Sequence, residues 1–159
     1  MQGMYLDVDE QFMDLALAEA KKAEASGEVP VGAVIVSDGI VIAKSFNRPL
    51  SLNDPTAHAE IGALRDACRE QGNYRLSNAT MYSTVEPCMM CAGAMIHARL
   101  ARLVFGTPDP NAGSAGSIYN VLTDPRLNHR VEVISGIRED ECASLLRDFF
   151  QRRRGGQSL

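Results

Sequence analysis

The sequence contains no long apolar run, and this absence excludes the membrane-spanning classes of protein. A transmembrane helix needs about 20 consecutive apolar residues, and no stretch of the 159 residues approaches that length. Residues 1–10 also lack the basic start and the apolar stretch of a secretory signal peptide. We therefore expect a cytoplasmic protein without a membrane partner.

Cysteine is scarce, with four residues in the chain, and their distribution argues against a disulfide framework. Cys88 and Cys91 form a Cys-x-x-Cys pair, whereas Cys68 and Cys142 occur in amphipathic helical patterns. Isolated cysteines in such patterns are more often buried free thiols than disulfide partners. The cysteines therefore suit a reducing compartment.

The chain also lacks an excess of basic residues, since its formal net charge is −4. The acidity is local, because residues 1–20 hold five acidic residues and no lysine or arginine, which leaves the rest at +1. Residues 147–154 hold four arginines, Arg152 and Arg153 among them, against one aspartate. This stretch suits contact with phosphate groups, although arginines also favour the end of an ordinary solvated helix.

The feature that decides the function is His58-x-Glu60, followed later in the chain by Pro87-Cys88-x-x-Cys91. Together these segments supply one imidazole, two thiols and one additional carboxylate. A catalytic zinc site keeps three protein ligands and leaves the fourth position for water, whereas a structural site closes all four. The sequence predicts one zinc ion held by His58, Cys88 and Cys91, with Glu60 beside the open position to move protons.

The first of these segments reads as the beginning of a helix. Residues 54–56, Asp-Pro-Thr, are typical of a helix start, and we predict a helix from about residue 57 to residue 71 with His58 in its first turn. Residues i and i+2 of a regular helix point roughly 200° apart, so His58 and Glu60 cannot share a face. The metal must therefore lie near the end of this helix.

The second segment also reads as a helix start, because proline is tolerated where no backbone N–H is needed. Cys88 and Cys91 stand at i and i+3 and share one helix face. The exposed amides of a first turn favour negative charge, which lowers thiol pKa and favours the thiolate. Two thiolates make zinc-held water less acidic than an all-imidazole site would, so Glu60 is needed as a base. These properties indicate hydrolytic deamination.

The two segments match the known His-x-Glu and Pro-Cys-x-x-Cys signature of zinc-dependent nucleobase deaminases. This signature marks the wider cytidine-deaminase-like superfamily. Further stretches make the chain similar to the bacterial tRNA-specific adenosine deaminases. They are Glu28-Val29-Pro30-Val31-Gly32-Ala33-Val34, Asn47-Arg48-Pro49, Asp54-Pro55-Thr56-Ala57 before His58, Thr84-Val85-Glu86 before Pro87, and Asn128-His129-Arg130.

The resemblance implies hydrolysis of adenosine to inosine at the wobble position of a tRNA anticodon loop, with one zinc ion per subunit. It also implies an arginine tRNA as partner and a homodimer. By the same resemblance Asn47 hydrogen-bonds the flipped base, Val31 forms part of the pocket wall, and Asp109 contacts the nucleic-acid backbone beside the target nucleotide. Two prolines flank Asp109 and should stiffen its loop.

Four further residues are candidate substrate contacts on chemical grounds. The backbone amide of Ala59 is placed to position the water or the leaving group. His129, within Asn-His-Arg, is a candidate RNA contact. With Arg152 and Arg153 of the terminal stretch, it would form an apron around the target nucleotide.

Two alternative functions remain open at this point. One is a free-base or nucleoside deaminase acting on guanine, cytosine or cytidine, which must enclose a small ligand completely. An RNA enzyme instead needs an open pocket with an apron for flanking nucleotides. The other is an RNA-binding module with a structural zinc and an unseen fourth ligand, in which Glu60 would have no purpose. We expect the tRNA enzyme.

Hydrophobic periodicity predicts an α/β protein with three layers, a central mixed five-stranded sheet between helices, as in cytidine-deaminase-like proteins. We expect one deaminase domain over residues 1–154 and a disordered tail at 155–159. Residues 111–117 lack the Lys-Ser/Thr ending of a phosphate loop and are expected to be a flexible connection. Strands are predicted at 31–36, 40–45, 79–85, 100–105 and 131–134, and helices at 13–23, 57–71, from 88, and at 139–154.

Overall fold

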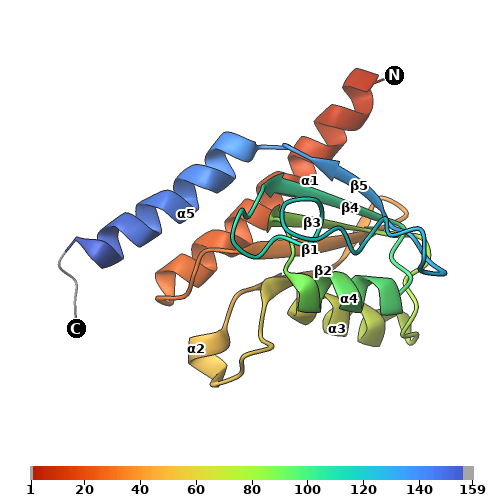
Figure 1. The fold of residues 1–159 in the computed structure, drawn as a ribbon, viewed down its shortest axis with the longest axis horizontal. Helices are drawn as coiled ribbons and strands as arrows, with labels where there is room; N and C mark the ends of the chain where they lie inside the picture. The colour runs from red at the N-terminus through yellow and green to blue at the C-terminus, as the bar shows by residue number, and fades with distance from the viewer. Residues whose placement is uncertain (1, 156–159) are drawn as a thin grey trace.

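The computed structural model describes residues 2–155, with side chains from residue 7 onward. Its centre is a five-stranded mixed sheet of order β2-β1-β3-β4-β5, with helices on both faces (Figure 1). The expected three-layer architecture is therefore confirmed. Of the predicted tail, residues 156–159 lie outside the described residues. No helix within the described range is long and apolar enough to cross a membrane.

The observed elements follow the predicted order, with one additional short helix between β2 and α3. The helices are α1 (Gln2–Ala25), α2 (Pro49–Leu52), α3 (Ala59–Gln71), α4 (Met89–His97) and α5 (Glu139–Arg154). The strands are β1 (Gly32–Ser37), β2 (Ile40–Phe46), β3 (Ala79–Val85), β4 (Arg102–Thr107) and β5 (Glu132–Ser135). The addition is α2, which begins with a proline at a first-turn position, as is common at helix starts.

A tight hairpin starts the sheet. Asp38 and Gly39 join β1 to β2 and have φ values of 52° and 74°. A two-residue hairpin turn of this kind needs positive φ at both positions, which aspartate and glycine tolerate. β1 then pairs antiparallel with β3, and β3, β4 and β5 are mutually parallel.

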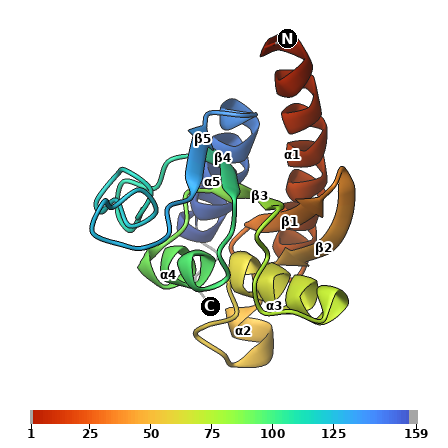
Figure 2. The same cartoon turned by 90° about the vertical axis from the view of Figure 1, so that its right-hand side faces the viewer.

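Alternating side chains of the sheet divide the core into two halves. Ala33 and Ile35 of β1 belong to the half covered by α3 and α4, while Val34 and Val36 belong to the half covered by α1. Figure 2 shows the two helical layers on opposite sides of the strands. A strand buried on both faces has no solvent-facing side, which is why β1 reads as a continuous apolar run.

One edge of the sheet collects the segments that matter for function. Because β3 and β4 are parallel, their carboxyl ends at Val85 and Thr107 lie together, and the antiparallel β1 begins at the same edge with Gly32. Helix α4 starts four residues after β3 ends. We call this edge the site end, since crevices at the carboxyl ends of strands are the usual ligand sites of open α/β sheets.

Candidate active site

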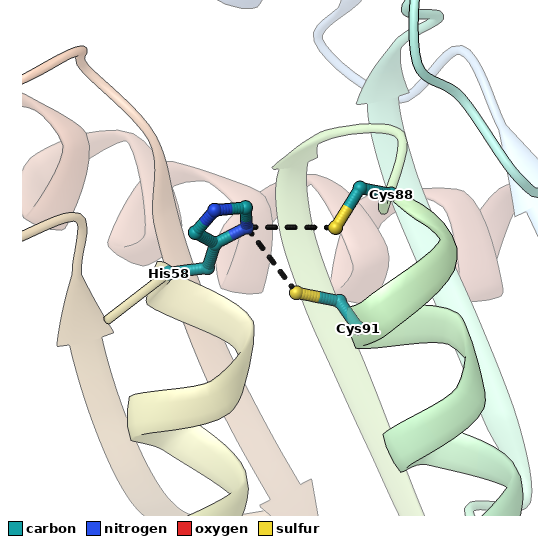
Figure 3. A group of neighbouring side chains, drawn as sticks. All are labelled: His58, Cys88 and Cys91. Carbon is teal, nitrogen blue, oxygen red and sulfur yellow. Dashed lines mark hydrogen bonds between the residues drawn. The ribbon is translucent and has the colours of Figure 1, made fainter. Parts of the chain in front are cut away.

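Three side chains converge at the site end from the beginnings of two helices. His58 and Cys88 are the N-cap residues of α3 and α4, and Cys91 lies in the first turn of α4. The Nδ1 atom of His58 is 3.5 Å from the sulfur of Cys88 and 3.5 Å from the sulfur of Cys91 (Figure 3). The predicted trio is thus brought together from positions 30 residues apart.

The position of His58 differs from the prediction. Helix α3 begins at Ala59, so His58 precedes the first turn and has an extended backbone with φ −73° and ψ 152°. Asp54 does not cap the helix, because its Oδ1 atom accepts hydrogen bonds from the N–H and the hydroxyl of Thr56 in a turn of its own. Because His58 lies outside the helix, the helical rotation does not fix the direction of its imidazole. His58 and Glu60 can therefore both face the site, although they are two residues apart.

The donor set fits a zinc ion with an open coordination position. Among the described residues, these three form the only group of His, Cys, Asp or Glu ligand atoms that all lie within 4.8 Å of one another. A hydrogen bond from Cys91 lowers the pKa of Cys88 to about 4, and a hydrogen bond from His58 acts in the same direction. Thiolate and neutral imidazole are the ligands that zinc prefers. A chain of this fold can therefore hold the metal that its sequence predicts.

Glu60 lies in the first turn of α3, directly beside this trio. Its side chain is buried, with 4% of the residue exposed. Burial raises the pKa of Glu60 to about 7, against the opposing effects of its backbone N–H and of His58. A carboxyl group with such a pKa both accepts and donates protons near neutral pH.

Val31, Asn47 and Ala59 form a continuous chain of hydrogen bonds beside the trio. The N–H of Asn47 donates to the carbonyl of Val31 at 3.1 Å, and the N–H of Ala59 donates to the side-chain oxygen of Asn47 at 3.1 Å. The amide of Ala59 is therefore already bonded within the protein. Asn47 keeps its NH₂ group as a donor, since an asparagine side chain carries both a donor and an acceptor.

Asp109 follows β4 at the site end, in the segment of residues 108–118, which we call the Asp109 loop. Its Oδ1 atom accepts hydrogen bonds from the N–H groups of Asn111 and Ala112, so part of the carboxylate holds the loop itself. The expectation of a flexible connection is wrong, because the buried carboxylate of Glu86 binds the loop at several points. Sequence reasoning missed Glu86, which lies next to the Pro-Cys-x-x-Cys motif.

The terminal arginines reach the site end but have partners there. Arg152 forms an ion pair with Glu24 at 2.6 Å, and Arg153 donates to the carbonyl of Gly27 at 2.6 Å while its guanidinium covers the ring of Phe149. These contacts attach the end of α5 to the end of α1. Both arginines are exposed and retain further N–H donors for other groups.

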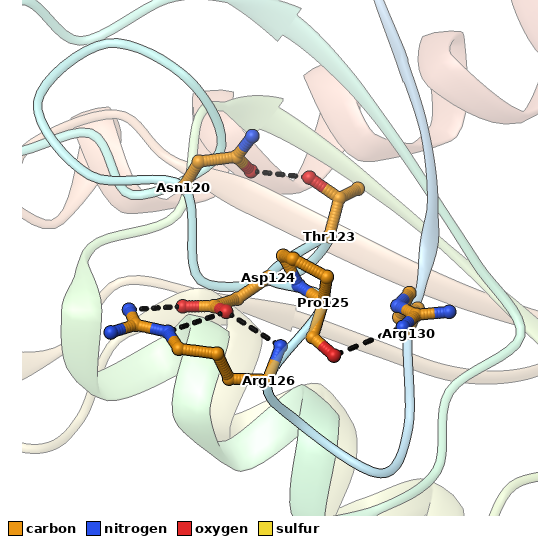
Figure 4. A network of polar contacts seen from close by, with 6 residues as sticks. All are labelled: Asn120, Thr123, Asp124, Pro125, Arg126 and Arg130. Carbon is orange, nitrogen blue, oxygen red and sulfur yellow. Dashed lines mark hydrogen bonds and ion pairs between the residues drawn. The ribbon is translucent and has the colours of Figure 1, made fainter.

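His129 lies at the opposite end of the sheet. Its Nε2 atom is 2.7 Å from the carbonyl oxygen of Leu100, which precedes β4, whereas Asp109 follows the same strand. Around it, Arg126 pairs with Asp124, and Arg130 donates to a backbone carbonyl (Figure 4). The structure therefore does not bring this segment together with the other candidate contacts.

The chain is similar to known deaminases over most of its length. A profile of the MafB19-like deaminases matches residues 7–154. The tRNA-specific adenosine deaminase of Haemophilus influenzae is 50% identical over 149 residues, which cover 93% of this chain and 86% of that protein. The corresponding protein of Bacillus subtilis is 46% identical over 146 residues, covering 92% of this chain and 91% of that protein.

Solved structures give the same result at the level of the fold. A chain from structural studies of A-to-I editing by tRNA:A34 deaminases at the wobble position superposes with a TM-score of 0.83 and 48% identity, covering 86% of this chain and 99% of that one. A guanine deaminase of Nitrosomonas europaea has a TM-score of 0.78 at 24% identity over 88% of this chain and 83% of that one, which shows a shared fold alone. The chain belongs to the tRNA-specific adenosine deaminases, within the MafB19-like deaminases and with their cytidine-deaminase-like fold.

Proposed function

We propose that this protein hydrolyses adenosine to inosine at the wobble position of a tRNA anticodon loop. The observation that carries the proposal is the approach of His58 Nδ1 to both cysteine sulfurs with the buried Glu60 alongside. The similarity to tRNA-specific adenosine deaminases supports the choice of substrate. Family resemblance further favours an arginine tRNA.

His58, Cys88 and Cys91 are the proposed ligands of one zinc ion per subunit. Zinc held in this way supplies Lewis-acid chemistry, since it makes water a stronger acid and hence a better nucleophile at neutral pH. The chain itself supplies the proton transfers, and Glu60 is the buried carboxyl group next to the ligands.

Glu60 has two successive tasks in the proposed reaction. It first takes a proton from the attacking water and gives it to N1 of adenine while the C6–O bond forms. It then moves the proton of the new hydroxyl group to the amino nitrogen, the C6–N bond breaks, and ammonia leaves. Adenosine and one water molecule thus yield inosine and ammonia. One carboxyl group performs both transfers because it is regenerated in its ionised form at the end.

The surroundings of Glu60 suit a base that is turned out of an RNA loop. The NH₂ group of Asn47 is the proposed donor to the base, and Val31 is the proposed wall. A cavity of about 170 Å³ opens beside His58 and is lined by Arg48 and Arg65, among other residues. The lining also includes Arg69 and one aspartate, Asp66, and this excess of positive charge beside His58 favours a ligand whose flanking groups are phosphates.

The proposal includes the organisation of the protein. We propose one deaminase domain over residues 1–154, working in the cytoplasm, where tRNA is available. A homodimer is proposed because an apolar groove of about 540 Å³ runs between α3 and α4, lined by Ile61 and Ala94 among others, and the nearby Met89 is 51% exposed. Exposed apolar patches of this kind are typical of protein interfaces. Sedimentation equilibrium measures the subunit number directly.

The deciding experiment offers the purified protein four substrates in parallel: total tRNA, free guanine, cytidine and adenosine. We expect inosine at the first anticodon position of an arginine tRNA and at least tenfold slower release of ammonia from the three small substrates, because these lack the flanking nucleotides. Glu60→Ala serves as the blank, since it removes the proton carrier and keeps the three proposed ligands. Ammonia from guanine alone would replace the proposal with a free-base deaminase.

A further inference from the structure

The carboxylate of Glu86 is buried between the end of β3 and the Asp109 loop, with 3% of the residue exposed. Its Oε1 atom accepts the N–H of Asp109 at 2.9 Å and the hydroxyl of Ser117. Its Oε2 atom accepts the N–H of Ala115 at 2.9 Å and the N–H of Ser117 at 3.0 Å. Four donors from one loop therefore converge on a single side chain that lies 23 to 31 residues earlier.

The surroundings of Glu86 are those of a carboxylate held by the protein itself. The four N–H and O–H groups that point at its two oxygens stabilise the charged form of the side chain. None of the ion pairs found among the described residues involves Glu86. Its neighbours are N–H and O–H donors, which oppose the binding of a cation, so its charge is balanced by hydrogen bonds from the loop.

A second observation shows that the loop is built around this carboxylate. A methyl group added at Gly113 would overlap the carboxyl group of Glu86. Ser114 then donates its N–H to the carbonyl of Pro87 at 2.8 Å. The loop is thus packed against the residue that immediately precedes the Cys88 ligand, and only glycine leaves room for the contact.

We propose that Glu86 is a positioning residue that holds the Asp109 loop against the Cys88 turn, in the shape in which the loop receives the RNA. This inference rests on the proposed function for the identity of the ligand. Glu86 touches neither substrate nor metal in this arrangement, because all its acceptor positions are directed at the loop. Its effect is on the rim of the site, and the expected signature is a change in KM with little change in kcat.

The test compares Glu86→Gln with Glu132→Gln, which removes the same charge from an exposed position on β5. A glutamine has one oxygen, so its NH₂ group must face N–H donors of the loop and those hydrogen bonds are lost. We expect hydrogen exchange at the amides of Asp109, Ala115 and Ser117 to become at least about tenfold faster in Glu86→Gln. We expect no change in Glu132→Gln.

Kinetics with the tRNA anticodon stem-loop give the functional half of the test. Glu86→Gln should raise KM about tenfold, with kcat within about twofold of wild type and zinc content unchanged. Gly113→Ala should give the same KM increase by pushing the carboxyl group away. The double variant should cost little more than either single change, because both break one contact.

The outcomes separate this inference from the proposed function. Unchanged exchange at the three amides, or the full additive cost in the double variant, overturns the role of Glu86. So does loss of zinc in Glu86→Gln, which would make the residue a support of the ligand set alone. Failure of the wild-type protein to deaminate the stem-loop contradicts the proposed function, while the exchange measurement still decides whether Glu86 holds the loop.

Discussion

Two glutamates of this protein, Glu60 and Glu86, are almost equally buried, yet their pKa values are shifted in opposite directions. Glu60 is 4% exposed and Glu86 is 3% exposed, and both lie beside Cys88 and Cys91, the proposed metal ligands. The pKa of Glu60 is raised to about 7, because burial dominates. The pKa of Glu86 is lowered, because hydrogen bonds from Ser117, Asp109 and Ala115 outweigh its burial.

The difference shows that burial alone does not assign a role to a buried carboxyl group. Desolvation disfavours the charged form, whereas every N–H or O–H donor stabilises it. Glu60 has few donors and therefore stays able to exchange protons, while Glu86 has four and stays charged. The number of hydrogen-bond donors around each carboxyl group therefore decides the direction of its pKa shift.

A third buried glutamate behaves like Glu86 on the other side of the site. Glu28 is 1% exposed and accepts hydrogen bonds from the N–H of Leu50, the N–H of Ser51 and the hydroxyl of Ser51. These donors belong to α2, which follows Asn47 in the chain. Two segments around the site are therefore each held by a buried glutamate, and of these three glutamates Glu60 is the one with few donors.

The largest expected effect comes from Glu60→Gln. Removal of the proposed proton carrier should lower kcat by about 10³-fold, since general acid–base catalysis contributes about 10² to 10⁴-fold. Elemental analysis and thermal unfolding should show wild-type zinc content and stability. A proportional loss of zinc would mean that Glu60 supports the ligands, and the contrast with Glu86 would then disappear.

Glu28→Gln should show the opposite pattern. Its three hydrogen bonds are made to a charged acceptor, and each such bond contributes about 1.5–3 kcal/mol. The amide oxygen of glutamine can still accept some of these bonds, so we expect a loss equivalent to about one of them. The free energy of unfolding, measured in urea, should fall by about 2 kcal/mol, with kcat almost unchanged. Glu132→Gln, an exposed substitution, is the matched control for the lost charge. A Glu28→Gln variant of normal stability but with a lower kcat would show that Glu28, like Glu60, acts in catalysis instead.

Arg152 and Arg153 each already have a partner in the protein, so their contribution to RNA binding also has to be measured. Arg152→Ala combined with Arg153→Ala should weaken tRNA binding several-fold and reduce the slope of log K against log salt by about 1 to 2. The control is Arg126→Ala with Arg130→Ala, which removes two arginines near His129 at the other end of the sheet. Equal effects of the two pairs would show that overall charge, and not the position of α5, governs binding.

The smallest effect is the pH dependence of stability that Glu28 contributes. The pKa of Glu28 is lowered, because its hydrogen bonds from Ser51 and Leu50 outweigh the opposing effect of burial. Its stabilisation is therefore complete above the ordinary value of 4.5 and is lost as the pH falls through the lower folded pKa. The difference in unfolding free energy between wild type and Glu28→Gln should be constant from pH 7 to about pH 5 and then shrink. A difference that grows in acid would reverse the sign of the shift.

Much of the fold follows from local patterns. Strand β3 and helix α5 have the predicted bounds, because a continuous buried run and a clear amphipathic period define them. Helix α2 was not predicted, since a helix of four residues that begins with a proline carries no periodic signal. The start of α3 was placed two residues early, because Asp54 turns its side chain to Thr56 and leaves the N-cap position to His58.

The centre of the site was predictable and its rim was not. His58, Cys88 and Cys91 are recognisable because metal chemistry fixes residue types and spacing. The partners of Glu86 lie in a segment without regular structure, and backbone N–H groups have no residue type to recognise. The placement of His129 away from the site depends on strand direction, which the spacing of residues does not encode.

The meeting of His58 and Cys88 has a consequence for the folding of the chain. A metal bound by both residues would cross-link the chain and close a loop of residues 59–87, which contain α3 and β3. Such a cross-link reduces the freedom of the unfolded chain, as a disulfide does, and so favours the native state. Chelation should therefore lower the melting temperature as well as abolish turnover, which would make metal supply a limit on how much folded protein accumulates.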